Sequence, residues 1–129
     1  MSKTVAELVA EAKARVGSVS PKDAAAEAAA GKAVFLDVRE PVEWEHHIAG
    51  AVQVPRGLLE FIADPTSPKH KPELDPAGRV IVYCRSGVRA ALACATLLDM
   101  GYTNVANLEG GFGAWQEAGL PANEHHDGF

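Results

Sequence analysis

Hydrophobic residues near the start of the chain recur at helical spacing. Between residues 4 and 16 they form one stripe made of Val5, Leu8, Val9, Ala12 and Val16, with charged residues on the other side. This segment is therefore expected to form an amphipathic helix. A second helix is predicted between Ser20 and Gly31, because serine is a good N-cap, the following proline suits the first helical position, and glycine commonly ends a helix.

Short apolar runs without polar alternation follow, and they predict buried strands. The predicted strands cover residues 33–38, 51–54, 79–83 and 104–108. Helical segments are predicted between and after them, over residues 42–46, 57–63, 90–100 and 112–118. Because strands and helices alternate, the chain is expected to adopt an α/β fold, with a central, mainly parallel sheet and helices on both faces.

The length of 129 residues fits one domain, and no repeat or linker interrupts it. We expect an N-terminal amphipathic helix over residues 1–17, a domain over residues 18–121 and a loose, polar C-terminal tail over residues 122–129. The segment 64–78 is rich in Pro, Lys, Asp and Ser and has no periodicity. It is expected to be a surface loop.

Charge and composition exclude several classes of function. The chain has 12 Lys and Arg against 17 Asp and Glu, a net charge of −5, which argues against nucleic acid or an anionic membrane as the main partner. No apolar run approaches the ~20 residues that a membrane span needs, and the N-terminus lacks the apolar core of a signal peptide. Two cysteines form neither a disulfide scaffold nor a four-ligand zinc site. We expect a soluble, cytoplasmic protein without a metal ion.

Cys84 is the candidate nucleophile. It follows the clearest strand and immediately precedes a helix, the place where open α/β sheets bind ligands. The first turn of a helix presents unpaired N–H groups and the positive end of the helix dipole. If the loop curls around Cys84, these donors would favour its thiolate form and hold it ready to attack. Cys94 lies on the apolar face of the same helix and is expected to be a packing residue.

The residues after Cys84 fit an anion-binding loop. Gly87 permits a tight cradle, and Ser86 adds a hydroxyl donor. Arg85 and Arg89 bring permanent charge and planar donors, and Val88 adds its backbone amide. These five residues are the candidate substrate-binding set. Two further residues, Asp37 and Arg39, stand at the end of the first long strand and are expected to support the pocket.

Several segments, in this order along the chain, resemble the motifs of the rhodanese family. They are residues 37–44, similar to the amino-terminal motif; 47–51, similar to the segment after it; 84–89, similar to the six-residue active-site loop; and 110–115 with 118–121, similar to the carboxyl-terminal motif. His46 departs from the pattern, because glycine is more usual there. The resemblance covers residues 18–121 and implies the three-layer rhodanese-like fold.

The resemblance also implies an activity, that of a thiosulfate sulfurtransferase. In such a cycle Cys84 would attack the outer sulfur of thiosulfate or a similar small anionic donor, and sulfite would leave. The resulting persulfide would sit among the backbone N–H groups of residues 85–89, and the arginines would orient the sulfonate of the donor. Cyanide, a thiol or an acceptor protein would then take the sulfur. The cycle needs no metal or organic cofactor.

Other classes of function stay open at this stage. A cysteine-dependent phosphatase or arsenate reductase also uses a thiolate in an anion cradle, but its signature places five residues between cysteine and arginine. Here four residues intervene, and Ala90 stands at the arginine position. A rhodanese-like binding module without activity would not need the cysteine that is present. A persulfide carrier in a sulfur-relay pathway would keep the chemistry, and the sequence does not reveal its acceptor.

Overall fold

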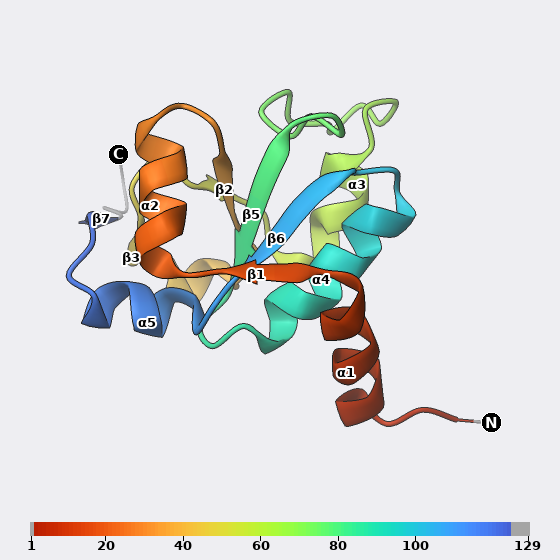
Figure 1. Ribbon diagram of the computed structural model, residues 1–129. Coiled ribbons are helices and arrows are strands. Elements are labelled where there is room, and N and C mark those ends of the chain that lie inside the picture. Colours follow the sequence, from red (N-terminus) through yellow and green to blue (C-terminus); the bar gives the residue numbers. More distant parts are fainter. Residues whose placement is uncertain (1, 125–129) are drawn as a thin grey trace.

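A five-stranded parallel sheet is the centre of the computed structural model, which describes residues 2–124 (Figure 1). Its strands are β1 (Gly17–Val19), β2 (Val34–Asp37), β4 (Val52–Gln53), β5 (Arg79–Tyr83) and β6 (Asn104–Leu108). Their order is β1-β6-β5-β2-β4, and every neighbouring pair is parallel. The predicted α/β class is confirmed.

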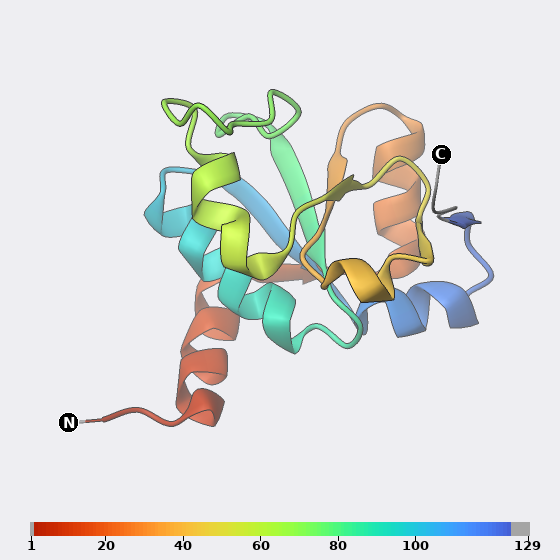
Figure 2. The ribbon, with the colours of Figure 1, turned by 180° about the vertical axis from the view of Figure 1, so that it is seen from behind.

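Helices cover both faces of this sheet (Figures 1 and 2). One face carries α1 (Val5–Arg15), α3 (Leu59–Ala63), α4 (Val88–Asp99) and the short 3-10 turn η2 (Arg56–Leu58). The other face carries α2 (Pro21–Ala29) and α5 (Gly111–Glu117), while the 3-10 turn η1 (Pro41–Glu43) follows β2. This is the predicted three-layer arrangement.

Strand β5 shows how the sequence positions the site. Successive side chains of a strand point to opposite faces, so Val80 and Val82 join the cluster under α4, while Ile81 and Tyr83 join the cluster under α2 and α5. All four are at most 1% exposed. Burial on both faces explains why the strand reads as a continuous apolar run. The next residue, Cys84, lies on the α4 side.

The predicted helix start at residue 20 is confirmed. Ser20 is the N-cap of α2, and its hydroxyl accepts from the backbone N–H of Asp23 at 3.1 Å. Helix α1 begins with a similar cap, because Thr4 and Glu7 form a reciprocal capping box. Helix α1 then packs against α4, where Arg15 reaches Asp99 at 2.7 Å.

Three short strands escape the sequence prediction, namely β1, β3 (His46–Ile48) and β7 (Ala122–Glu124). Strand β7 pairs antiparallel with β3, so the expectation of a loose tail is wrong for residues 122–124. The rest of that tail lies outside the described residues. Three residues are too few to show the alternation that identifies a strand.

The segment between α3 and β5 is a surface loop, as predicted, and contains no helix or strand over residues 64–78. It is anchored inward by Leu74, which is fully buried, and by His70, whose Nδ1 lies 2.9 Å from the carbonyl oxygen of Ile62. Within residues 2–124, no helix combines the length and apolar character required to cross a membrane. The predicted division at residues 17 and 121 stays a prediction.

Candidate active site

Cys84 lies where β5 enters the loop before α4, and its sulfur faces backbone amides. The N–H of Gly87 donates to Sγ at 3.1 Å and that of Ala90 at 3.4 Å. The expected cradle therefore exists in a smaller form, shifted toward the first turn of α4. The amides of residues 85, 86, 88 and 89 make no such contact within the described chain. Cys84 itself is only 1% exposed.

The conformation of Gly87 makes this contact possible. Its φ is +107°, a left-handed value that other residues reach at a cost of about 1–2 kcal/mol. Its carbonyl accepts from the N–H of Ala91 at 3.1 Å and from Nδ2 of Asn107 at 3.0 Å. Asn107 comes from the end of β6 and is 7% exposed. Because two donors hold the carbonyl, the loop is fixed with the Gly87 N–H directed at Sγ.

Helix α5 holds the same loop through its first residues. The N–H of Phe112 donates to the carbonyl of Cys84 at 2.8 Å, and that of Gly113 donates to the carbonyl of Arg85 at 3.1 Å. Between these contacts, Gly111 leaves no room for a side chain. A Cβ there would lie 2.6 Å from the backbone of Cys84 and Arg85. The glycines of the carboxyl-terminal motif therefore allow α5 to touch the backbone of the cysteine loop.

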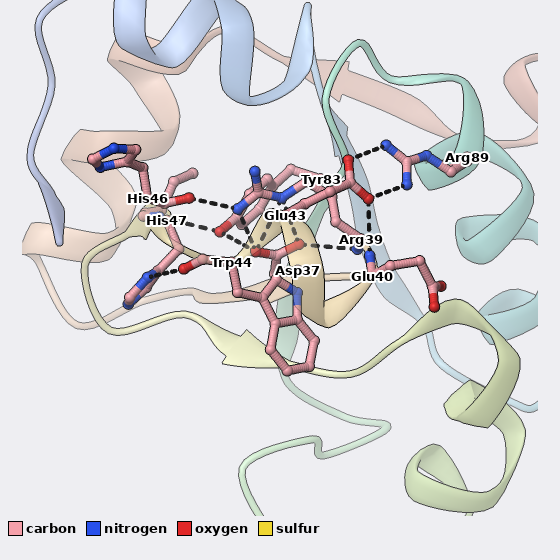
Figure 3. Close-up of polar contacts among 10 residues, drawn as sticks. Asp37, Arg39, Glu40, Glu43, Trp44, His46, His47, Tyr83 and Arg89 are labelled. Carbon is pink, nitrogen blue, oxygen red and sulfur yellow. Dashed lines mark hydrogen bonds and ion pairs between the residues drawn. The ribbon is translucent and has the colours of Figure 1, made fainter. Parts of the chain in front are cut away.

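A buried ionic network supports the site from the other side (Figure 3). Arg39, 3% exposed, donates to the fully buried carboxylate of Asp37 through Nε at 3.0 Å and Nη2 at 2.9 Å. The Tyr83 hydroxyl donates to Asp37 at 2.8 Å and accepts from the N–H of Ile48 at 3.1 Å. Burial raises the pKa of Tyr83, and the Asp37 carboxylate raises it further. The network thus fixes the residue immediately before Cys84.

The guanidinium of Arg39 also contacts residues of β3 and α5. Its Nη2 donates to the carbonyl of His46 at 2.8 Å, and its central carbon lies 4.6 Å from the ring centroid of Phe112. The side chains of Asp37 and Arg39 are therefore enclosed by protein. They connect β3 and α5 to the end of β2 and do not face solvent.

Arg89 is engaged by a carboxylate that the sequence analysis does not identify. Its Nη1 and Nη2 donate to the two oxygens of Glu43 at 2.7 and 2.9 Å, as Figure 3 shows. The hydrogen bond from Arg89 lowers the pKa of Glu43 to about 2. The pKa of Arg89 is raised, first by Glu43 and further by the nearby Cys84. Arg89, which is expected to be an unpaired cation beside the cysteine, is thus part of an ion pair with Glu43.

The remaining side chains of the predicted substrate-binding set make no hydrogen bond to the sulfur within the described chain. Arg85, Ser86 and Val88 are exposed, and none of their side chains forms a hydrogen bond or ion pair with the described residues. Ser86 and Gly87 line a cavity of about 200 Å³ together with residues of α1, β1 and β6. Cys84 does not line this cavity, so the cavity lies beside the cradle and not in it.

Cys94 behaves as the expected packing residue. It is fully buried on α4, and this burial raises the pKa of its thiol to about 12. Among residues 2–124, no group of three or more His, Cys, Asp or Glu side chains is arranged to hold a metal ion.

Three residues of the site are missed by sequence reasoning. Ala90 gives no chemical signal, because its backbone makes the contact. Glu43 meets Arg89 across 46 positions of the chain, so no local pattern pairs them. Asn107 does leave a signal, since a polar residue near the end of an otherwise buried strand needs a hydrogen-bond partner.

Comparison with known proteins gives a consistent result. The family model of the rhodanese-like domain matches residues 20–118. A sulfurtransferase from Allochromatium vinosum is 38% identical over 89 residues, which is 68% of this chain and 76% of that protein. The chloroplastic thiosulfate sulfurtransferase 16 of Arabidopsis thaliana is 36% identical over 92 residues, which is 67% of this chain and 77% of that protein.

Solved structures show the same fold. A protein of unknown function from Rhodopseudomonas palustris, described as a possible tyrosine phosphatase, is similar with a TM-score of 0.85 and 38% identity. The likeness covers 94% of this chain and 95% of that one. Some curated relatives are much longer than this chain. Two of them are 34% identical to it, and the match covers 22% of the length of each.

Proposed function

The chain belongs to the rhodanese-like sulfurtransferase family, and from that premise we propose that Cys84 carries the transferred sulfur as a persulfide. The observation that supports this proposal most strongly is the pair of amides, Gly87 N–H and Ala90 N–H, directed at Sγ. Hydrogen bonds to an ionised acceptor are stronger than those to a neutral one, so these two N–H groups are suited to hold a negatively charged sulfur.

The proposed reaction has two steps. The Cys84 thiolate attacks the outer sulfur of the donor, thiosulfate or a similar compound; the new Sγ–S bond forms while the S–S bond of the donor breaks. The leaving group, sulfite in the case of thiosulfate, departs with the electron pair of the broken bond. A thiolate or cyanide then attacks the outer sulfur of the persulfide, and the Cys84 thiolate returns. The same two amides serve the free thiolate and the persulfide, because both forms of Cys84 place a negatively charged sulfur in the loop.

The burial of Cys84 fits sulfur better than phosphate. With 1% of the residue exposed, Cys84 leaves no room at its surface for a bulky phosphate ester, whereas a single sulfur atom is much smaller. The loop also has four residues between Cys84 and Arg89, and the following position supplies an amide, from Ala90, where a phosphatase needs its arginine. These features weigh against the phosphatase function described as possible for the R. palustris protein. An inactive module is disfavoured by the formed cradle.

The domain limits of 18–121 and a cytoplasmic site of action, where acceptor thiols are reduced, are part of the proposal. Intact-mass spectrometry after incubation with thiosulfate tests its chemistry. The wild-type protein should gain one sulfur atom, and the gain should map to Cys84. The Cys94→Ser variant, which keeps the nucleophile, is the matched control and should gain it too. A gain that persists in Cys84→Ser would refute the assignment.

A further inference from the structure

The ion pair between Arg89 and Glu43 changes the charge that the loop offers to a donor. The Glu43 carboxylate has a second hydrogen-bond partner besides Arg89, because its Oε1 also accepts from the backbone N–H of Glu40 at 3.0 Å. Its pKa of about 2 keeps it charged throughout the neutral range. The positive charge of Arg89 is therefore matched by a fixed negative charge 2.7–2.9 Å away.

Arg89 nevertheless keeps donors for the sulfur. A guanidinium has five N–H groups, and the bidentate pair with Glu43 uses one on each Nη. Three N–H groups stay available on a side chain that is 40% exposed and close enough to Cys84 to be influenced by it. Arg89 thus has N–H groups left for a sulfur anion, while its charge is already matched by that of Glu43.

The other charges near the loop do not restore a positive excess. Arg39 is paired with Asp37 at 2.9 Å, and both are buried. Arg85 is exposed and makes no ion pair with the described residues, and the Cys84 thiolate that the proposed reaction requires carries the opposite charge. Lys13 and Glu109, which line the cavity beside the loop, carry charges of opposite sign. The site in its reactive state is near neutral overall, within a chain of net charge −5.

A near-neutral site discriminates between sulfur donors. Thiosulfate carries two negative charges and needs a cation for its sulfonate, whereas a persulfide on an uncharged thiol carries at most one charge and has no sulfonate. We propose that Glu43 is a specificity-determining residue. By occupying the two Nη donors of the Arg89 guanidinium, it selects the persulfide or polysulfide of a thiol over thiosulfate as the sulfur donor. This inference rests on the proposed persulfide function of Cys84 and specifies its donor class.

The transfer from such a donor balances without a further reactant. The Cys84 thiolate attacks the terminal sulfur of R–S–S⁻, the Sγ–S bond forms, and the S–S bond of the donor breaks. The thiolate R–S⁻ leaves with the electron pair, and Cys84 is left as Sγ–S⁻. No net oxidation takes place, because one persulfide is exchanged for another.

Glu43→Gln tests the inference, because glutamine keeps an oxygen for the Glu40 amide and removes the charge. Glu40→Gln is the matched control: it removes one carboxylate from the same turn, and the Glu40 side chain points away from Arg89 in Figure 3. Single-turnover loading of Cys84 is measured by mass spectrometry with two donors, thiosulfate and the persulfide of 2-mercaptoethanol. The readout is the ratio of the two second-order loading rates.

In the wild-type protein the persulfide should load Cys84 faster than thiosulfate. Glu43→Gln should raise the thiosulfate-to-persulfide ratio about tenfold, the size of one charge–charge interaction of about 1.4 kcal/mol at a partly exposed site. The gain should shrink with added salt, whereas Glu40→Gln should stay within about twofold of the wild type. An unchanged or lower ratio in Glu43→Gln would overturn the specificity role and leave the persulfide function intact. Failure of both donors to load the wild-type protein would overturn both.

Discussion

The contact between Gly111 and the cysteine loop can be tested by adding one methyl group. In Gly111→Ala the new Cβ would lie 2.6 Å from the carbonyl carbon and oxygen of Arg85 and from the carbonyl oxygen of Cys84. These are backbone atoms, so the clash cannot be relieved by turning a side chain. The substitution is therefore expected to push α5 and the loop apart and to disturb the amides around Sγ.

Gly119→Ala is the matched control. Gly119 has a φ of +69°, close to the +61° of Gly111, but a Cβ there meets no atom within 4 Å. In both variants the alanine must adopt a left-handed conformation, which costs about 1–2 kcal/mol. In both, the substitution also lowers the conformational entropy of the unfolded chain by the same amount. Gly111→Ala should lose a further ~1–3 kcal/mol through overpacking. The difference between the two variants isolates the contact with the loop.

Urea unfolding gives the free energies, and loading of Cys84 from a sulfur donor gives the functional effect. Gly111→Ala should unfold at lower urea than Gly119→Ala and should load sulfur more slowly under folded conditions. Equal stability and equal loading rates in the two variants would show that α5 does not hold the loop in the way described.

Three other predictions concern the residues around the loop. Asn107→Ala removes the side-chain donor to the Gly87 carbonyl and so loosens the Gly87 N–H that is directed at Sγ. A loss of about 1.4 kcal/mol in that hydrogen bond to the sulfur anion should slow sulfur loading about tenfold, as stopped-flow alkylation or loading kinetics would measure; unchanged kinetics would exclude this positioning role. Because the pKa of Glu43 is lowered to about 2 from an ordinary 4.5, its pair with Arg89 stabilises the fold above pH 4.5, and this stability should disappear as the pH falls toward 2. Urea unfolding at several pH values between 2 and 6 measures this. The free energy of unfolding should fall less steeply with decreasing pH in Glu43→Gln than in the wild type, and equal pH dependence in the two proteins would contradict the pairing. Asp37→Asn leaves the Arg39 charge buried without a counter-ion and should destabilise the protein by about 3–5 kcal/mol; a loss below about 1 kcal/mol in chemical denaturation would contradict the buried network.

The sequence predicts the central part of the fold because its strands are buried on both faces. Strand β5 is a run of apolar residues, and such runs are informative even in isolation. The short strands β1, β3 and β7 depend on partners far away in the chain, and three residues carry too little pattern to reveal them. The C-terminal residues 122–124 consequently differ from expectation, whereas the Ser20 cap, a local signal, is confirmed.

The site divides in a similar way. Cys84 and its position after a strand are evident from the sequence, and the inert role of Cys94 follows from the periodicity of its helix. The partners of the loop are not evident, because Glu43 and Asn107 reach it through tertiary contacts. Backbone geometry is equally hidden: the donors to Sγ come from Gly87 and Ala90, while the sequence alone predicts residues 85–89.

The proposed function depends on two peptide amides that hold an anionic sulfur at position 84. The most direct measurement is a pair of amide spectra of ¹⁵N-labelled protein, recorded before and after one sulfur atom is loaded onto Cys84, with Cys84→Ser treated in parallel. The N–H signals of Gly87 and Ala90 should move more than that of Gly119, and Cys84→Ser should show no such change. Signals of Gly87 and Ala90 that stay in place while Cys84 carries the sulfur would show that these two amides do not hold it.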